Sequence, residues 1–193
     1  MSQLILDSFR KHIDLSLEEE QEILNRLHHA QYKTKTVLIK PGDTADFSYF
    51  VLDGILKSYT TDANGADHIL SFATPGWWMA DMYAYLGDNP AIMTIDVVED
   101  CDVLILYKKD VEELYIQIPK LERFFRILTQ NNLIANQQRV LDKMTLTAEE
   151  RYERFLEKFP KVNQCLPQKY IASYIGVTPE FFSKMKSRLL RKK

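Results

Sequence analysis

The spacing of apolar residues changes twice along the chain and divides it into a helical start, a strand-rich middle and a helical end. Residues 1–30 are predicted to be helical, because a capping box at Ser16–Glu19 is followed by apolar residues at helical spacing. From Tyr32 to Tyr107, short apolar runs alternate with turn signals such as Asn64-Gly65, which is typical of antiparallel β structure. Helical spacing returns after Asp110. The middle of the chain is therefore predicted to be a β-sandwich or barrel, interrupted by one short helix within residues 79–86.

The longest predicted helix covers Leu121–Met144, a stretch without proline or glycine. Ile127, Ile134 and Leu141 recur at intervals of seven residues, so they form one seam along the helix. Asparagine and glutamine interrupt this seam and make it an imperfect coiled coil. At ~1.5 Å per residue the helix is ~36 Å long. A second capping box, Thr147–Glu150, predicts that a new helix begins after a hinge.

The most specific local signal lies near the C-terminal end, where two short helices are predicted at Gln168–Ile175 and Glu180–Leu190. Gly176 permits the left-handed turn between them. Thr178 is a good N-cap, and Pro179 stands at the first helical position, where its missing amide costs nothing. The second helix has a buried apolar ridge and an opposite face that is polar and cationic. This pattern predicts a helix-turn-helix whose second helix enters the major groove.

The residues predicted to contact DNA are expected to be exposed, either on this face or at the starts of the two helices. They are Gln168, Lys169, Thr178, Glu180, Phe181, Ser183, Lys184, Lys186, Ser187 and Arg188. Glu180 is expected to accept from a cytosine amine and Lys184 to reach a guanine edge, while the later basic residues are expected to contact phosphates. An ordinary helical hairpin with a solvated basic end is the alternative interpretation of the same residues.

The net charge of the chain argues against DNA binding, whereas the distribution of charge along it argues for DNA binding. The 25 Lys and Arg residues and 27 Asp and Glu residues give a net charge of −2, which is unlike a strongly basic nucleic-acid-binding protein. Residues 1–144, however, carry 14 basic and 22 acidic groups, whereas residues 145–193 carry 11 basic and 5 acidic groups. The near-neutral total therefore averages an acidic N-terminal part with a basic C-terminal part.

Several other classes of protein are not expected. With 46% apolar and 27% charged residues, the composition is that of a globular protein. No run of 18 apolar residues exists and the start does not resemble a secretory signal, so we expect no membrane association. Only Cys101 and Cys165 are present, which favours a reduced cytoplasmic location. The four histidines are scattered, so we expect no metal and no resident cofactor.

The order of these parts resembles the Crp/Fnr family of bacterial transcription regulators, and the C-terminal segment is similar to its Bacteroidetes-type branch. The motifs that carry the resemblance are Pro41-Gly42-Asp43, Val51–Lys57, Asn64-Gly65, Phe72–Gly76, Val98–Asp100 and Gln168–Met185. The resemblance implies an α+β fold with an N-terminal antiparallel, jelly-roll-like β-roll flanked by helices. A long central dimerisation helix and a C-terminal winged helix-turn-helix domain follow. The expected boundaries are 1–118, 119–145 and 146–193.

The resemblance also implies how such a protein works. It predicts a sequence-specific regulator that binds double-stranded DNA as a homodimer, with RNA polymerase and a small-molecule effector as further partners. The dimer contact is expected at Phe124, Ile127, Leu128, Ile134 and Leu141. The effector pocket of the β-roll is expected at Trp77, Trp78, Ala80, Asp81, Met82, Tyr83, Met93 and Thr94, with Met79 and Tyr85 nearby. The alternative is that these large side chains simply fill the core of the roll.

Cyclic AMP is not the expected effector. Family members that bind it carry Gly-Glu and, some ten residues later, Arg-Ser or Arg-Thr, whereas this chain has Ala80-Asp81 and Met93-Thr94. No Lys or Arg lies between Ser58 and Tyr107, although eight acidic residues do. A buried phosphate without a cationic partner is costly. We therefore expect neither cyclic AMP nor cyclic GMP to bind tightly.

Two other functions are weighed against transcription regulation. An enzyme on a cupin-like barrel would need clustered ligands or a nucleophile–base pair, and the predicted roll holds only His68. We therefore expect no enzyme. A ligand-binding or protein-interaction module with weak or no DNA binding is the second alternative. It is favoured by Pro179, which stands where the resembled family commonly has an arginine.

Overall fold

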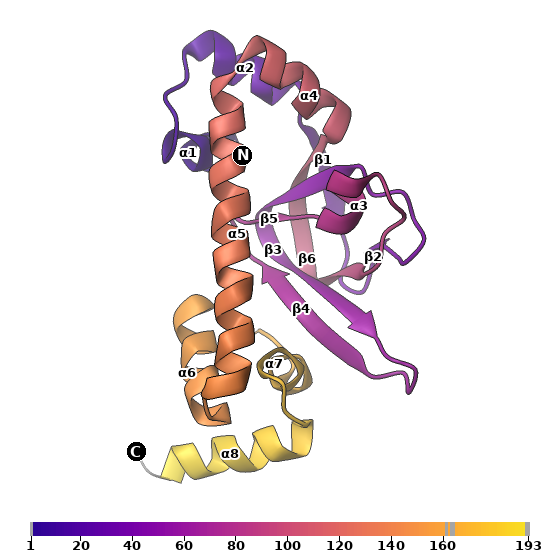
Figure 1. Ribbon diagram of the computed structural model, residues 1–193, viewed down its shortest axis with the longest axis vertical. Coiled ribbons are helices and arrows are strands. Elements are labelled where there is room, and N and C mark those ends of the chain that lie inside the picture. The colour runs from indigo at the N-terminus through magenta and orange to yellow at the C-terminus, as the bar shows by residue number, and fades with distance from the viewer. Residues whose placement is uncertain (1, 161, 163–164, 192–193) are drawn as a thin grey trace. The chain divides into compact units, whose positions relative to one another are not determined.

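The computed structural model describes residues 2–160, 162 and 165–191 (Figure 1). Its elements follow the helix–strand–helix order predicted from the sequence, and the α+β fold with an antiparallel roll, a long helix and C-terminal helices is confirmed. The elements are α1 (Ser2–Arg10), α2 (Leu17–Asn25), β1 (His28–Tyr32), β2 (Val37–Ile39), β3 (Phe47–Thr61), β4 (Asp67–Ala73), β5 (Trp78–Met79), α3 (Met82–Gly87), β6 (Thr94–Tyr107), α4 (Lys108–Gln117), α5 (Lys120–Thr145), α6 (Ala148–Lys158), α7 (Gln168–Ile175) and α8 (Pro179–Arg191).

The strands form one sheet in the order β1-β6-β3-β4, with β2 on β6 and β5 on β3. β1 pairs antiparallel with β6, so that His28 lies opposite Ile105. This strand lies in a region that the sequence predicted to be helical. The prediction was wrong there because His28–Tyr32 is polar and lacks alternation, and its pairing with a distant strand decides its structure.

The longest strands, β3 and β6, each join two runs that the sequence showed as separate. Asp53-Gly54 interrupts the apolar residues of β3 as a turn signal would, but Gly54 lies inside the strand with φ +82°. A Cβ at Gly54 would come within 2.2 Å of the Asp100 carbonyl oxygen and 2.8 Å of the Cys101 Cα. The backbone of β3 at Gly54 thus lies close to that of β6 at Asp100 and Cys101, and only glycine permits this close approach.

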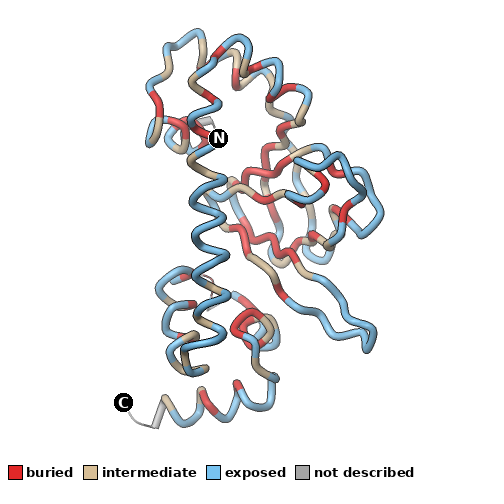
Figure 2. The backbone as a smooth tube through the Cα atoms, viewed as in Figure 1, coloured by how far each residue is buried: buried red, intermediate tan, exposed pale blue. Residues whose placement is uncertain are grey.

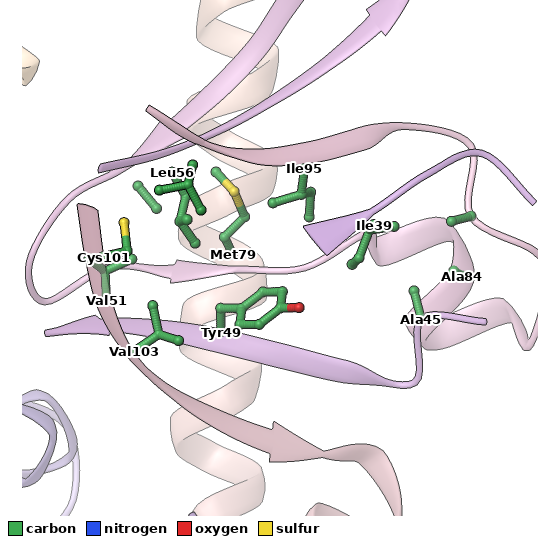
Figure 3. Packing of buried hydrophobic residues seen from close by; sticks show 13 residues of the cluster. Ile39, Ala45, Tyr49, Val51, Leu56, Met79, Ala84, Ile95, Cys101 and Val103 are labelled. Carbon is green, nitrogen blue, oxygen red and sulfur yellow. The ribbon is translucent and has the colours of Figure 1, made fainter. Parts of the chain in front are cut away.

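Two apolar clusters stabilise the N-terminal unit. Inside the roll, Tyr49, Val51, Leu56, Ile95 and Val103 pack with neighbouring side chains (Figure 3). On the other face of the strands, the helices contribute a second cluster. Its members include Ile5, Phe9, Phe50, Leu106, Val111, Leu114, Leu121 and Phe124. Burial is therefore concentrated on the strands and on the helix faces that cover them (Figure 2).

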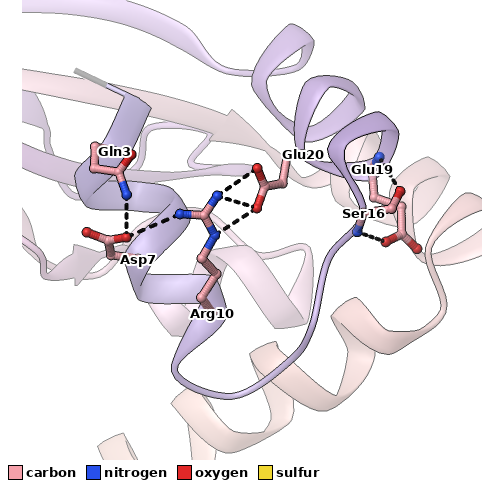
Figure 4. A network of polar contacts seen from close by, with 6 residues as sticks. All are labelled: Gln3, Asp7, Arg10, Ser16, Glu19 and Glu20. Carbon is pink, nitrogen blue, oxygen red and sulfur yellow. Dashed lines mark hydrogen bonds and ion pairs between the residues drawn. The ribbon is translucent and has the colours of Figure 1, made fainter.

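Polar contacts link α1 to α2 and cap the start of α2 (Figure 4). The Arg10 guanidinium donates to both carboxylate oxygens of Glu20 at 2.8 Å. The predicted capping box is confirmed, since the Glu19 amide donates to Ser16 Oγ and the Ser16 amide donates to the Glu19 carboxylate. The first contact therefore joins α1 to α2, and the second fixes the start of α2.

Contacts divide the chain into two compact units, an N-terminal unit of residues 1–58 with 72–131 and a C-terminal unit of residues 59–71 with 132–193. The second unit includes the outer end of the β3–β4 hairpin, where the Ile69 amide donates to Ser173 Oγ at 2.9 Å. α5 begins in the first unit and ends in the second. The boundaries predicted at 118 and 145 stay predictions. No strand follows Tyr107 in the part of the chain that the structure describes, so the expected wing is not found there.

Candidate DNA-binding surface and effector site

The helix pair at the C-terminal end has the geometry that the sequence predicts. α7 spans Gln168–Ile175, and Gly176 follows in the left-handed conformation with φ +77°. The Val177 amide donates to the Ala172 carbonyl at 3.0 Å and closes the turn. Thr178 Oγ1 then accepts from the Phe181 amide at 3.2 Å, and α8 begins at Pro179. The turn and the cap each follow from a single residue type in the right place.

An aromatic core fixes α8 against α6 and α7. Phe182 is completely buried and meets Tyr152 edge-on, with ring centroids 5.1 Å apart. Ala172 is also completely buried, as expected of a small residue where two helices cross. Met185 belongs to the same buried ridge, whereas Val177 in the turn is only half-buried. The opposite side of α8 is therefore held outward.

The residues predicted to contact DNA lie on that outward side. Glu180, Phe181, Ser183, Lys184, Ser187 and Arg188 are exposed, and Lys186 is half-buried. Gln168, Lys169 and Thr178 are exposed at the beginnings of the helices. Some of these side chains already have partners within the chain: the Arg188 guanidinium forms an ion pair with the Glu149 carboxylate on α6, and Ser187 Oγ donates to the Ser183 carbonyl at 3.0 Å. The contacts with DNA stay predictions for all of them.

The exposed apolar face of α5 lies in its second half. Leu133, Ile134, Val140 and Leu141 are each between 52% and 63% exposed, which is unusual for four apolar side chains on one helix. The predicted dimer contact needs a correction at its N-terminal end. Phe124 is completely buried within its own unit, where it packs on Phe9 with ring centroids 4.4 Å apart.

Leu128 also packs against this cluster of the same chain, and Ile127 is half-buried. The first turns of α5 therefore complete the core of the N-terminal unit. The sequence pattern did not reveal this, because apolar side chains at helical spacing look the same whether they face another chain or their own sheet. Ile134 and Leu141 are the two predicted contact residues that stay exposed.

The most constrained polar group of the expected effector site is Asp81. Its side chain is completely buried and caps α3. One carboxylate oxygen accepts from the Tyr83 and Ala84 amides at 3.1 and 3.2 Å, and the other accepts from the Ile92 and Met93 amides at 2.8 and 3.1 Å. The carboxylate therefore uses four backbone amides that converge on one point. This negative charge belongs to the chain itself, so it disfavours an anionic ligand at the same place.

The other residues of that site do not gather in one cavity. Trp78 lies on the outer face of its strand and meets Phe9 and Phe50 edge-on, while its neighbour Met79 points into the roll. Because successive strand residues point to opposite faces, the two cannot line one pocket. Trp77, Met82 and Tyr83 are exposed by 36%, 37% and 52%. Ala80, Met93, Thr94 and Tyr85 are half-buried.

Sequence reasoning missed a buried ion pair in the N-terminal unit. Lys57 Nζ lies 2.7 Å from an Asp96 carboxylate oxygen, and their side chains are 3% and 13% exposed. Lys57 stands just outside the stretch in which the sequence showed no basic residue. Its charge is compensated by Asp96, so it does not provide the cation that a phosphate would need.

Burial raises the pKa of the Cys101 thiol to about 12, which makes this cysteine unreactive.

Comparison with known proteins agrees with this architecture. Residues 29–117 match the protein family described as cyclic nucleotide-binding domain. The Anaerobic regulatory protein of Haemophilus influenzae is 24% identical over 164 residues, which cover 79% of this chain and 63% of that protein. Transcriptional regulatory protein btr of Bordetella pertussis is 24% identical over 162 residues, which cover 77% of this chain and 65% of that protein.

Among solved structures, FixK2 from Bradyrhizobium japonicum superimposes with a TM-score of 0.76 at 20% identity, covering 86% of this chain and 85% of that one. This likeness shows the fold. The chain spans less than two thirds of the length of the curated relatives named above. Both curated relatives are named as regulatory proteins. None of the helices in the described part of the chain combines the length and the apolar character that crossing a membrane requires.

Proposed function

We propose that this chain, whose residues 29–117 match the cyclic nucleotide-binding domain family, is a DNA-binding transcription regulator of the Crp/Fnr type. The observation that carries the proposal is the outward face of α8. There a buried ridge of Phe182 and Met185 holds Glu180, Lys184 and Ser187 toward solvent. A helix fixed in this way presents base-reading and phosphate-binding side chains to a major groove. The excess positive charge of residues 145–193 supports the same partner.

The chain acts as a homodimer in this proposal. The exposed stripe of Leu133, Ile134, Val140 and Leu141 lies on the part of α5 that belongs to the second of the two units. Burying these side chains against a second copy removes apolar surface from water. Two copies then bring two α8 helices to two half-sites. RNA polymerase as a further partner and a cytoplasmic location belong to the same proposal.

DNA binding is tested by selecting duplexes from a randomised pool and measuring fluorescence anisotropy. We expect two inverted half-sites and an affinity that falls steeply with salt. Lys184→Ala should weaken binding by ~1–3 kcal/mol and relax the preference at one base pair of each half-site. Lys169→Ala removes the same charge from an exposed position of α7, and it should weaken binding about equally for all sequences.

The second candidate function, a ligand-binding or protein-interaction module, is favoured by Pro179 at the start of α8. It becomes the better description if no duplex from the pool binds even at low salt. A Lys184→Ala effect that is uniform across sequences would also contradict base reading by this residue.

We further propose that neither cyclic AMP nor cyclic GMP is the effector. The Asp81 carboxylate accepts hydrogen bonds from four converging backbone amides, and the charge of Lys57 is compensated by Asp96. A cyclic phosphate entering there would meet a carboxylate without a free cation, which is unfavourable. Titration calorimetry with each nucleotide should show no binding of micromolar affinity at the roll. Micromolar binding that Asp81→Asn strengthens or weakens would contradict this proposal.

A further inference from the structure

The C-terminal unit contains an open cavity of about 640 Å³ that the DNA-binding proposal does not use. It lies among the end of α5, the length of α6 and the end of α7, and all of its lining residues belong to this one unit. Its size is in the range of cavities that hold small ligands, roughly 300–1,000 Å³. The cavity is on the surface of the helices that fix α7 and α8, away from the exposed apolar stripe of α5.

The charged side chains around this cavity are mostly basic. Its lining includes five cations, which are Arg139, Lys143, Arg151, Arg154 and Lys158. Two carboxylates, Asp142 and Glu157, line it as well, so the lining has a net charge of +3. The whole chain, in contrast, has a net charge of −2. A concentration of positive charge in a hollow surface attracts anions more strongly than the same charges on a flat one.

Arg139, Lys143 and Arg151 form no ion pair with a carboxylate among the residues that the structure describes. Asp142 is used by Arg154, whose guanidinium nitrogen lies 2.5 Å from the carboxylate. Arg151 donates to the backbone carbonyls of Ile175 and Leu146 at 2.8 and 2.7 Å, which fixes its position without cancelling its charge.

Arg139 likewise donates to a backbone carbonyl, that of Leu70, and lies over the ring of Tyr174 at 5.4 Å from its centroid. Lys143 has neither a hydrogen bond nor an ion pair with any residue that the structure describes. Its pKa is lowered by burial and by the nearby charges of Arg139 and Arg151. The cations therefore repel one another, and a bound anion would relieve this repulsion.

The cavity also has an apolar wall. Phe155 and Tyr174 are buried residues of the unit's core whose rings lie 5.5 Å apart, and both line the hollow beside Ile175. Ligand sites commonly combine such a wall with a few converging charged groups. The wall is rigid because it belongs to the core that also holds α8.

We propose that this cavity binds a small molecule that carries a diphosphate group. A diphosphate ester carries one negative charge on its inner phosphate and roughly −1.5 to −2 on its terminal phosphate at neutral pH, so its total is close in size to the net charge of +3 of the lining. Arg139 and Lys143 from α5 and Arg151 and Arg154 from α6 would contact the phosphate oxygens. The proposal goes beyond DNA binding and does not depend on it, because none of these residues lies on the outward face of α8.

The probe is sodium pyrophosphate, titrated into the full chain at constant ionic strength and followed by calorimetry and thermal unfolding. We expect one molecule to bind per chain with a Kd below about 1 mM and to raise the unfolding temperature. Lys143→Gln should weaken binding by about ten- to hundredfold, because it removes one charge-assisted contact. The variant itself should unfold at the same or a higher temperature than the unmodified chain, since it removes like-charge repulsion.

Lys184→Gln is the matched control, because it removes the same charge from the outward face of α8. It should leave pyrophosphate binding unchanged, so that a loss in this variant would place the anion on α8 and overturn the proposal. Absence of binding at about 1 mM, or equal binding by Lys143→Gln and the unmodified chain, would overturn it as well. DNA binding is measured separately in each variant, so a failure of the proposed function is distinguishable from a failure of this site.

Discussion

Lys57→Met is expected to lower the free energy of unfolding by about 3–5 kcal/mol. Lys57 is buried and Asp96 is mostly so, with 13% of its side chain exposed, and their charged groups lie 2.7 Å apart. Removing the lysine leaves the Asp96 carboxylate buried without its cation. The second oxygen of Asp96 already has no hydrogen-bond partner among the described residues, so little is left to stabilise the charge. Urea unfolding followed by circular dichroism measures the loss.

The double variant Lys57→Met with Asp96→Val is the control for this pair. It replaces both charges by apolar groups, and valine suits a strand such as β6. Since the desolvation cost of a buried pair is comparable with its attraction, the double variant should be closer in stability to the unmodified chain than Lys57→Met alone. A cost below about 1 kcal/mol for the single variant would mean that the pair is accessible to water.

The C-terminal helices could be predicted almost to the residue because their signals are local. Gly176 supplies the left-handed turn and Thr178 with Pro179 supplies the start of α8, so no distant contact is needed to place them. The long helix α5 was predicted for the same kind of reason, the absence of any residue that ends a helix. Such features depend on neighbours only three or four positions away.

The sheet could be predicted as a class but not in its connections. Whether Gly54 ends a strand or bends one depends on Asp100 and Cys101, which lie more than 40 residues later in the sequence. The polar strand β1 exists because β6 pairs with it. The same limit applies to Phe124, since its burial depends on Phe9 of α1. Long-range packing of this kind leaves no periodic trace in the sequence.

The cationic cavity and the site of Asp81 differ in how much of each could be predicted from the sequence. The spacing of Arg151, Arg154 and Lys158 by three and four residues places them on one face of α6, and this signal was available. The sequence did not show that these residues lie beside Arg139 and Lys143 of α5, because that depends on how the helices pack. The residue type of Asp81 was recognised as unusual, but its bonds with four amides were visible only in the structure.

Asp81→Ala is expected to destabilise the segment around α3 by about 3–5 kcal/mol. The change removes the one acceptor shared by the amides of Tyr83, Ala84, Ile92 and Met93. Each hydrogen bond to a charged group contributes roughly 1.5–3 kcal/mol, and buried amides left without a partner add a further cost. Hydrogen–deuterium exchange should show these four amides exchanging faster, while amides of the C-terminal unit stay unchanged.

The cost is limited by how easily the segment opens. α3 has only six residues, so it does not persist without tertiary contacts. If leaving four amides without acceptors costs more free energy than local unfolding, the segment unfolds locally and water accepts from these amides. Asp88→Asn is the matched control, because it removes a carboxylate from the other end of α3 that is exposed and pairs with Lys108. It should cost less than about 1 kcal/mol, and an equal effect of both variants would show that Asp81 acts only through its charge.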